Sequence, residues 1–130
     1  MADHLEPRIT LHPLSSRVRI LVGETVIADT GNALELREKG YPPRLYLPRA
    51  DVAMAKLSVS HTVTHCPFKG DSTYYSLPDF PDIAWSYDQP IEEMLAIAGR
   101  LAFEAEKVTL EACSPHPTDA GKVAHLYNFC

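Results

Sequence analysis

Prolines are spread along the whole chain rather than gathered in one linker, and there are 11 of them among 130 residues. Each proline lacks a backbone N–H and breaks the interior of an α-helix, so a mostly helical fold is disfavoured. Between the prolines lie short runs rich in β-branched residues, which favour extended strands. We therefore predict a mainly β fold.

The clearest strand signal is a pair of runs joined by a short turn. In Arg17–Val22 the apolar residues alternate with charged ones, and Gly23-Glu24 then offers a two-residue turn before Thr25–Asp29. This pattern predicts a hairpin over residues 17–29. Residues 33–38 fit either a strand or a single helical turn. Further strands are predicted at residues 44–47, 58–66, 72–77 and 83–87.

One short helix is predicted at about residues 90–99. Pro90 is tolerated in a first helical turn, and Gly99 is a natural stop. The apolar residues between them fall on one face at helical spacing: Ile91, Met94, Leu95 and Ala98. Beyond Gly99 an alternating pattern changes phase near residues 106–107. We interpret residues 101–110 as a bulged strand, with a helix continued to residue 107 as the alternative.

The predicted elements fill one domain over residues 17–112. An N-terminal extension (residues 1–16) precedes it, and a C-terminal tail without a clear period (residues 113–130) follows. No apolar run approaches the roughly 20 residues of a membrane-spanning helix. The first residues carry acid where a secretory signal peptide carries base. These features predict a cytoplasmic domain with no membrane partner.

Charge and cysteine content narrow the partners further. The chain has 12 Lys and Arg against 17 Asp and Glu, a net charge of -5. Nucleic acid is bound by clustered Lys and Arg, so it is not an expected partner. The cysteines are three, at unpaired positions, which argues against a disulfide framework.

The densest polar stretch is Thr64–Asp71. Within it, Cys66 beside His65 suggests a nucleophile and a base. Adjacent side chains of a strand point to opposite faces, however, so His65 does not easily reach the Cys66 sulfur. A buried Cys66 is the competing interpretation, because free cysteines are among the most buried residues. Lys69 either holds a carboxylate or phosphate or remains a solvated turn residue.

Metal-dependent chemistry has little support in the residues. His61 and His65 are four apart, which on a strand separates them by about 13 Å. There is no Cys-x-x-Cys pair to hold zinc, so we expect no metal ion and no cofactor. Nucleotidyl transfer needs acids for Mg²⁺ and a phosphate-binding turn. The nearest acids are Asp79 and Asp82, and the six glycines never form a G-x-G.

Aromatic residues on the predicted strands form the most informative set: Tyr46, Tyr74, Tyr75, Trp85 and Tyr87. Trp85 and Tyr87 are two apart and share a strand face, while Tyr46 lies opposite the apolar Leu45 and Leu47. Such rings line a ligand pocket or pack in a core with their hydroxyl groups at the surface. The residues alone leave these two interpretations equal.

Three segments together resemble a known family, and their order and spacing carry the resemblance. The segments are Tyr41–Pro48 followed by Asp51-Val52, then Thr64–Gly70, then Ala84–Tyr87 followed by Pro90. They are similar to the family catalogued as domain of unknown function 427, over about residues 17–111. The family also carries a nucleotidyltransferase-like label.

The resemblance implies a β-tent-like fold, in which two antiparallel sheets meet at an angle. That architecture is shared with methionine sulfoxide reductase B and with the thalidomide-binding domain of cereblon. Those proteins hold zinc with two Cys-x-x-Cys pairs, which are absent from this chain. The resemblance therefore implies neither structural zinc nor sulfoxide reduction here, because a fold does not carry its function along.

What the resemblance adds is the location of a ligand cavity between the sheets, walled by aromatic residues. The matched residues are its expected lining: Tyr46, His65, Cys66, Lys69, Tyr75, Trp85 and Tyr87. We expect an unknown small anionic or aromatic molecule to bind there and to be transformed if His65 acts as acid or base. Cys66 is then packing or a reserve nucleophile, and Lys69 holds the anionic group. The alternative is a non-catalytic interaction module or homodimer, with nucleotidyl transfer third.

Overall fold

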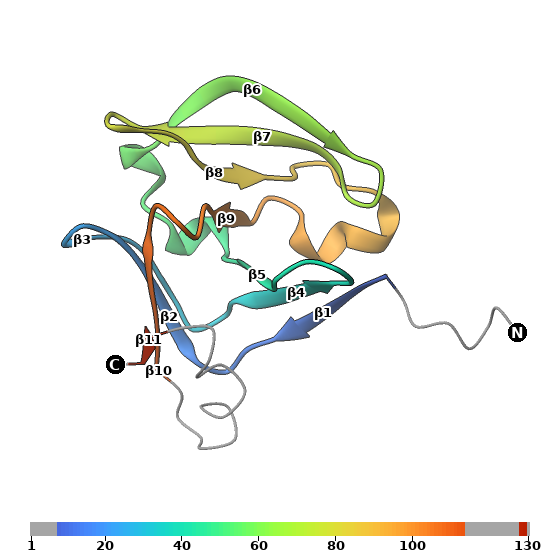
Figure 1. Cartoon of the computed structure of the whole chain (residues 1–130), viewed down its shortest axis with the longest axis horizontal. Coiled ribbons are helices and arrows are strands. Elements are labelled where there is room, and N and C mark those ends of the chain that lie inside the picture. The colour runs from blue at the N-terminus through green and yellow to red at the C-terminus, as the bar shows by residue number, and fades with distance from the viewer. Residues whose placement is uncertain (1–7, 114–127, 130) are drawn as a thin grey trace, which may run out of the picture.

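The structure, a computed structural model, describes residues 8–113, 128 and 129, and its strands form three sheets (Figure 1). The first sheet has the order β1-β4-β5, with β1 at Ile9–Pro13, β4 at Leu34–Glu38 and β5 at Arg44–Tyr46. The second has the order β11-β10-β2-β3, with β11 at Asn128–Phe129, β10 at Thr109–Cys113, β2 at Arg17–Val22 and β3 at Thr25–Thr30. The third has the order β6-β7-β8-β9, with β6 at Ser58–Cys66, β7 at Gly70–Leu77, β8 at Phe80–Ser86 and β9 at Leu101–Phe103.

The mainly β prediction is confirmed, but the expected two sheets are three. Neighbouring strands are antiparallel, apart from the short parallel pair β10–β11. One reason for the third sheet lies at Ile9–Pro13, within the segment taken as an extension. Strand β1 pairs with β4, and β4 pairs with β5, so these three strands form a sheet of their own.

The hairpin over residues 17–29 and the strand over residues 58–66 are confirmed. Gly23 at the hairpin turn has φ +61°, the left-handed conformation that glycine adopts without strain. Residues 33–38, which left a strand and a helical turn open, form strand β4. Most of the predicted tail lies outside the described residues.

The helix predicted at residues 90–99 is instead a short 3₁₀ segment, Glu92–Ile97, kinked at Met94. The stretch between Pro90 and Gly99 is too short for several α-helical turns, and a helix this short is marginal without tertiary packing. Met94 and Ile97 are its buried residues, so packing holds the segment. Two shorter 3₁₀ segments lie at Arg49–Asp51 and Met54–Lys56.

The single bulged strand predicted over residues 101–110 is wrong, and so is the helical alternative. Two strands of different sheets, β9 and β10, lie there instead. A turn closed by the hydrogen bond from Lys107 N to Glu104 O, 2.9 Å long, separates them. The change of phase near residue 106 therefore marks a passage from one sheet to another.

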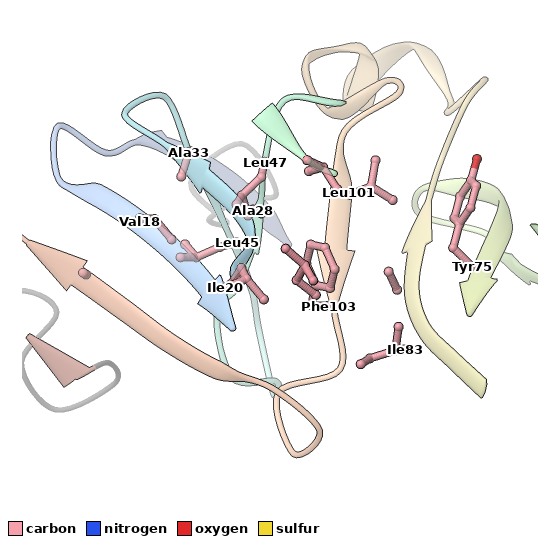
Figure 2. Packing of buried hydrophobic residues seen from close by; sticks show 14 residues of the cluster. Val18, Ile20, Ala28, Ala33, Leu45, Leu47, Tyr75, Ile83, Leu101 and Phe103 are labelled. Atoms are coloured by element: carbon pink, nitrogen blue, oxygen red, sulfur yellow. The ribbon is translucent and has the colours of Figure 1, made fainter. Parts of the chain in front are cut away.

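The sheets enclose a hydrophobic core to which all three contribute. Figure 2 shows Phe103 of β9 between Ile20 of β2 and Ile83 of β8, and all three side chains are buried. Burial of one such side chain stabilises the fold by about 1.5–3 kcal/mol. Leu47 and Leu101 join the first sheet to the third through two backbone hydrogen bonds of 2.8 and 2.9 Å.

A second buried cluster forms around Tyr46, Tyr87, Met94, Ile97 and Ala102. In β9, Leu101 and Phe103 belong to the first cluster, whereas Ala102 between them belongs to the second. The third sheet therefore has two packed faces. Among the described residues, no helix has the length and hydropathy to cross a membrane.

Candidate functional site

A pocket of about 470 Å³ opens beside the second cluster, between β4–β5 of the first sheet and β6–β8 of the third. Six of the seven side chains expected to line a ligand cavity contribute to it: Tyr46, His65, Cys66, Lys69, Trp85 and Tyr87. A volume of this size suits a small organic molecule, for which pockets of roughly 300–1,000 Å³ are typical. Two sheets build the pocket, so it exists only in the folded domain.

Aromatic rings make the walls of this pocket. The ring centroids of Tyr46 and Tyr87 lie 6.4 Å apart, and those of Tyr74 and Trp85 lie 6.1 Å apart. These tilted arrangements are among those that aromatic pairs prefer. Trp85 Nε1 also donates a hydrogen bond of 3.4 Å to Tyr46 Oη, which ties β8 to β5. The walls are thus held by contacts between the sheets.

Tyr75, the seventh expected residue, does not line the pocket, and its neighbour Tyr74 does. Tyr75 belongs to the first core cluster, in which Figure 2 shows its ring. Its hydroxyl oxygen accepts a hydrogen bond of 3.3 Å from Arg49, which also donates to Gly99 O. Adjacent strand residues face opposite sides, so the prediction was displaced by one position along β7.

Lys69 is buried at the pocket and is already paired. Its Nζ lies 2.9 Å from Glu38 Oε1, and both side chains are 11% exposed. Arg8 Nε approaches the other Glu38 oxygen at 3.7 Å. Burial lowers the pKa of Lys69, but the Glu38 hydrogen bond and nearby negative groups outweigh it, and the net effect raises the pKa. Lys69 therefore remains charged, and Glu38 balances that charge.

Backbone bonds on both sides of Lys69 fix its position. Lys69 N donates to Cys66 O at 3.1 Å, which closes the turn between β6 and β7. Ile91 N donates to Lys69 O at 2.9 Å and ties this turn to the segment before the 3₁₀ helix. The next residue, Gly70, has φ +123°, a conformation that favours glycine.

His65 and Cys66 contribute to the same pocket but have different neighbours. His65 Nδ1 lies 2.7 Å from Asp71 Oδ1, and the histidine side chain is 68% exposed. Cys66 is partly buried, with its sulfur 3.7 Å from Lys69 Nζ. The thiol thus contacts the lysine rather than the adjacent imidazole, as the alternation of a strand predicts.

Two tyrosine hydroxyl groups stay protonated at the pocket. Burial is the main cause that raises the pKa of Tyr46, and the Trp85 hydrogen bond opposes it. Burial also raises the pKa of Tyr87, strengthened by Tyr46 and Cys66. Both phenols therefore act as neutral donors near physiological pH.

The residues considered for a metal ion are dispersed. Within the described part of the chain, no three His, Cys, Asp or Glu side chains are grouped as a metal site requires. Asp79 and Asp82 belong to the β7–β8 hairpin region, and neither lines the aromatic pocket. Asp82 instead accepts a hydrogen bond of 2.8 Å from Thr62.

The pocket also contains residues outside the expected lining, among them Glu38, Arg44, Tyr74 and Glu104. The sequence pattern could have indicated Arg44 as a pocket residue, because Arg44 shares a strand face with Tyr46. Tyr74 is opposite Trp85 in the β7–β8 register, a pairing that the sequence leaves open. Glu38 and Glu104 come from distant segments, and their placement depends on how the sheets dock.

The comparisons with known proteins agree with the resemblance and add no activity. No curated protein matches this chain. The sequence profile of a family described only as a domain of unknown function, DUF427, matches residues 10–113. That match covers most of the chain, from β1 to the end of β10. The chain therefore belongs to the domain of unknown function 427 family.

Proposed function

We propose that this domain binds a small anionic or aromatic molecule in the pocket between the first and third sheets. The observation that carries the proposal is the convergence of Tyr46, Tyr74, Trp85 and Tyr87 with several charged side chains around one space of about 470 Å³. Ligand pockets typically combine apolar or aromatic walls with a few placed polar groups. The β-tent resemblance supports the same location, because β-tent cavities lie between sheets.

Transformation of the ligand is the further part of this proposal. Cys66 offers a sulfur nucleophile, and His65 offers an acid or base at the same pocket. Since the two side chains are not hydrogen-bonded to each other, each would act on the ligand directly. A product detected by mass spectrometry that disappears in both Cys66→Ser and His65→Gln supports turnover. Unchanged ligand after prolonged incubation contradicts it.

The binding proposal is tested by a thermal-shift panel read together with tryptophan fluorescence. Trp85 is the single tryptophan of the chain and lies in the pocket, so its emission reports occupancy directly. The panel contains nucleotides with and without Mg²⁺, small carboxylates, aromatic amides and methionine sulfoxide. A ligand at about 100 times its Kd stabilises the fold by roughly 2.7 kcal/mol.

The proposal expects at least one class to raise Tm and to change Trp85 emission with the same midpoint. A Tyr75→Phe variant is the matched control, because that hydroxyl lies outside the pocket. It retains the binding midpoint, whereas Tyr87→Phe shifts it. A panel without any shift in Tm or emission overturns the proposal.

A second candidate function is self-association through β6, and the open edge of this strand favours it. In the third sheet β6 pairs with β7 on one side and with no described strand on the other (Figure 1). Its side chains Val59 and Val63 are 68% and 65% exposed. Residues 58–66 carry no Asp, Glu, Lys or Arg, the charges that usually protect an open edge. An antiparallel pair of two β6 strands satisfies both edges at once.

Sedimentation velocity over a range of concentrations tests this second candidate. Self-association through β6 predicts a dimer in the unmodified chain and a monomer in Val63→Lys. A Val26→Lys variant is the control, because Val26 is also an exposed strand valine but lies in β3. A monomer at every concentration contradicts the candidate.

A further inference from the structure

Two tyrosine hydroxyl groups in the aromatic pocket, those of Tyr46 and Tyr87, are available as hydrogen-bond donors. Tyr46 Oη accepts from Trp85 Nε1 at 3.4 Å, and its own proton has no acceptor among the described residues. Tyr87 is 7% exposed, and its hydroxyl has no recorded partner among the described residues. Since burial keeps both phenols protonated, each has a proton to donate. A complementary ligand therefore presents acceptor oxygens.

Most of the charged groups at the pocket are already compensated. Lys69 and Arg8 both approach Glu38, at 2.9 and 3.7 Å. His65 is paired with Asp71 at 2.7 Å. The Lys69–Glu38 pair is mostly buried, so a ligand anion that recruited Lys69 would have to compete with a carboxylate already in place. Lys69 is thus poorly suited to the anion-binding role expected from the sequence.

Among the described residues, Arg44 is the cation at this pocket without a carboxylate partner. Its recorded contact is with Trp85, whose ring centroid lies 5.3 Å from the guanidinium carbon. Within the described residues no carboxylate lies within ion-pair distance of Arg44, and Glu104 at the same pocket forms no ion pair. A guanidinium stacked on a ring keeps its edge N–H groups free for a planar anion.

The charge balance favours a monoanion. Among the described residues, three cations (Arg8, Arg44 and Lys69) face two carboxylates (Glu38 and Glu104) around the pocket. One positive charge remains for a ligand, and a phosphomonoester of about -2 would leave the site net negative. The fork of Arg44 matches a carboxylate in two parallel hydrogen bonds. The surrounding rings match an aromatic body.

We infer that the pocket recognises an aromatic carboxylate, with the carboxylate bound by Arg44 and the ring held among Trp85, Tyr74 and Tyr87. This inference rests on the proposed function and names its ligand class. Lys69 is then a positioning residue that anchors Glu38 and the β6–β7 turn. The phenol protons of Tyr46 and Tyr87 are available to the oxygens of the same ligand.

The test compares probes that differ in charge and little in shape. Benzoate and benzamide are titrated against Trp85 emission, together with phenyl phosphate as the dianion. The inference predicts that benzoate binds at least about tenfold more tightly than benzamide, which corresponds to roughly 1.4 kcal/mol. It also predicts that phenyl phosphate binds more weakly than benzoate.

Variants assign the preference to one residue. Arg44→Gln removes the tenfold preference because it weakens benzoate binding far more than benzamide binding, whereas Arg17→Gln changes neither affinity. Arg17 is the matched control because it is an exposed strand arginine outside the pocket, 62% exposed and paired with Asp29. Circular dichroism of both variants shows whether the fold is retained. Arg44→Lys keeps the charge without the fork and retains part of the preference.

Equal affinity for benzoate and benzamide overturns the inference. So does a benzoate preference that survives Arg44→Gln, or stronger binding of phenyl phosphate. Failure of all three probes while another member of the thermal-shift panel binds also overturns it and leaves the proposed function standing. If nothing in the panel binds, the proposed function itself fails.

Discussion

Gly70 lies against the backbone of Pro90, so closely that a β-carbon on Gly70 would be 3.2 Å from Pro90 Cα. Gly70 also has φ +123°, which side-chain-bearing residues rarely adopt. We therefore predict that Gly70→Ala lowers the free energy of unfolding by about 1–3 kcal/mol. Urea denaturation followed by circular dichroism measures this change.

The control for this prediction is Gly31→Ala. A β-carbon on Gly31 would meet no atom within 4 Å, and its φ is not in the left-handed range. We expect this variant to match or slightly exceed the original chain in stability. Equal stability of both alanine variants would show that the Gly70 turn tolerates a side chain.

The Lys69–Glu38 pair predicts a dependence of stability on alkaline pH. Lys69→Met leaves Glu38, among the described residues, with the longer Arg8 contact alone, and lowers the free energy of unfolding by about 1–3 kcal/mol near neutral pH. Because the folded state raises the pKa of Lys69, its contribution is fully present below the ordinary value of 10.5. It is lost as the pH rises through the folded pKa.

Urea unfolding of the original chain and of Lys69→Met at several pH values checks this prediction. The difference between them should be constant below pH 10.5 and shrink above it. A double-mutant cycle with Glu38→Gln isolates the pairwise energy. Additive effects of the two substitutions would contradict the pair.

We predict that the contribution of Asp82 to the stability of the fold is lost at acidic pH. Hydrogen bonds from Ser60 and Thr62 are the main causes that lower its pKa from 3.8. Its contribution is present above that value and is lost as the pH falls through the folded pKa. Asp82→Asn isolates the charge, because asparagine also tolerates the φ of 52°.

We expect Asp82→Asn to cost about 1 kcal/mol or less at neutral pH, since the carboxylate is accessible to solvent. Thermal unfolding between neutral pH and about pH 3 should show the difference vanishing below pH 3.8. A constant difference across this range would assign the effect to packing instead of charge.

We predict opposite effects on stability and on ligand binding for Tyr75→Phe and Tyr87→Phe, because Tyr75 belongs to the first core cluster and Tyr87 lines the pocket. Tyr75→Phe removes a hydroxyl bonded to Arg49, and costs about 0.5–1.5 kcal/mol of stability without changing benzoate affinity. Tyr87→Phe removes a hydroxyl that has no hydrogen-bond partner among the described residues, so it weakens benzoate binding at nearly unchanged stability. Paired unfolding and fluorescence titrations measure both. A binding loss in Tyr75→Phe would contradict this division.

We predict that a bound ligand protects Cys66 from alkylation. Its side chain is partly buried at the pocket, so a bound aromatic carboxylate should slow its alkylation by iodoacetamide several-fold. Peptide mapping by mass spectrometry distinguishes this site from the other cysteines. Benzamide at equal concentration is the control and should protect less. Alkylation at the same rate with and without saturating benzoate would place the bound molecule elsewhere.

The strands that could be predicted were those whose signal is local. Strand β6 matches its prediction because its β-branched run lies between Leu57 and the turn at Pro67. The prediction of a short α-helix was wrong because helical spacing over a few residues does not distinguish an α-helix from a 3₁₀ segment. The 3₁₀ segment buries its own Met94 and Ile97. The division between β9 and β10 depends on which sheet each strand joins, and that is a long-range choice.

The site shows the same distinction between local and long-range information. Trp85 and Tyr87 could be placed together because two-residue spacing fixes their shared face. The resemblance implied Tyr75 in the lining, whereas Tyr74 lines the pocket; the sequence does not fix the pairing register, and one position reverses the face. Glu38 meets Lys69 across 31 positions of chain, a contact set by the docking of sheets.

The central pairing of β2 with β10 has a consequence for the order of events during synthesis. Arg19 and Glu111 face each other in that pairing although they are 92 positions apart. At ribosomal rates of about 5–20 residues per second, β2 waits on the order of ten seconds for its partner. During that interval the edge of β2 that later pairs with β10 is uncovered. The nascent chain is therefore most vulnerable to intermolecular strand pairing just before β10 emerges from the ribosome.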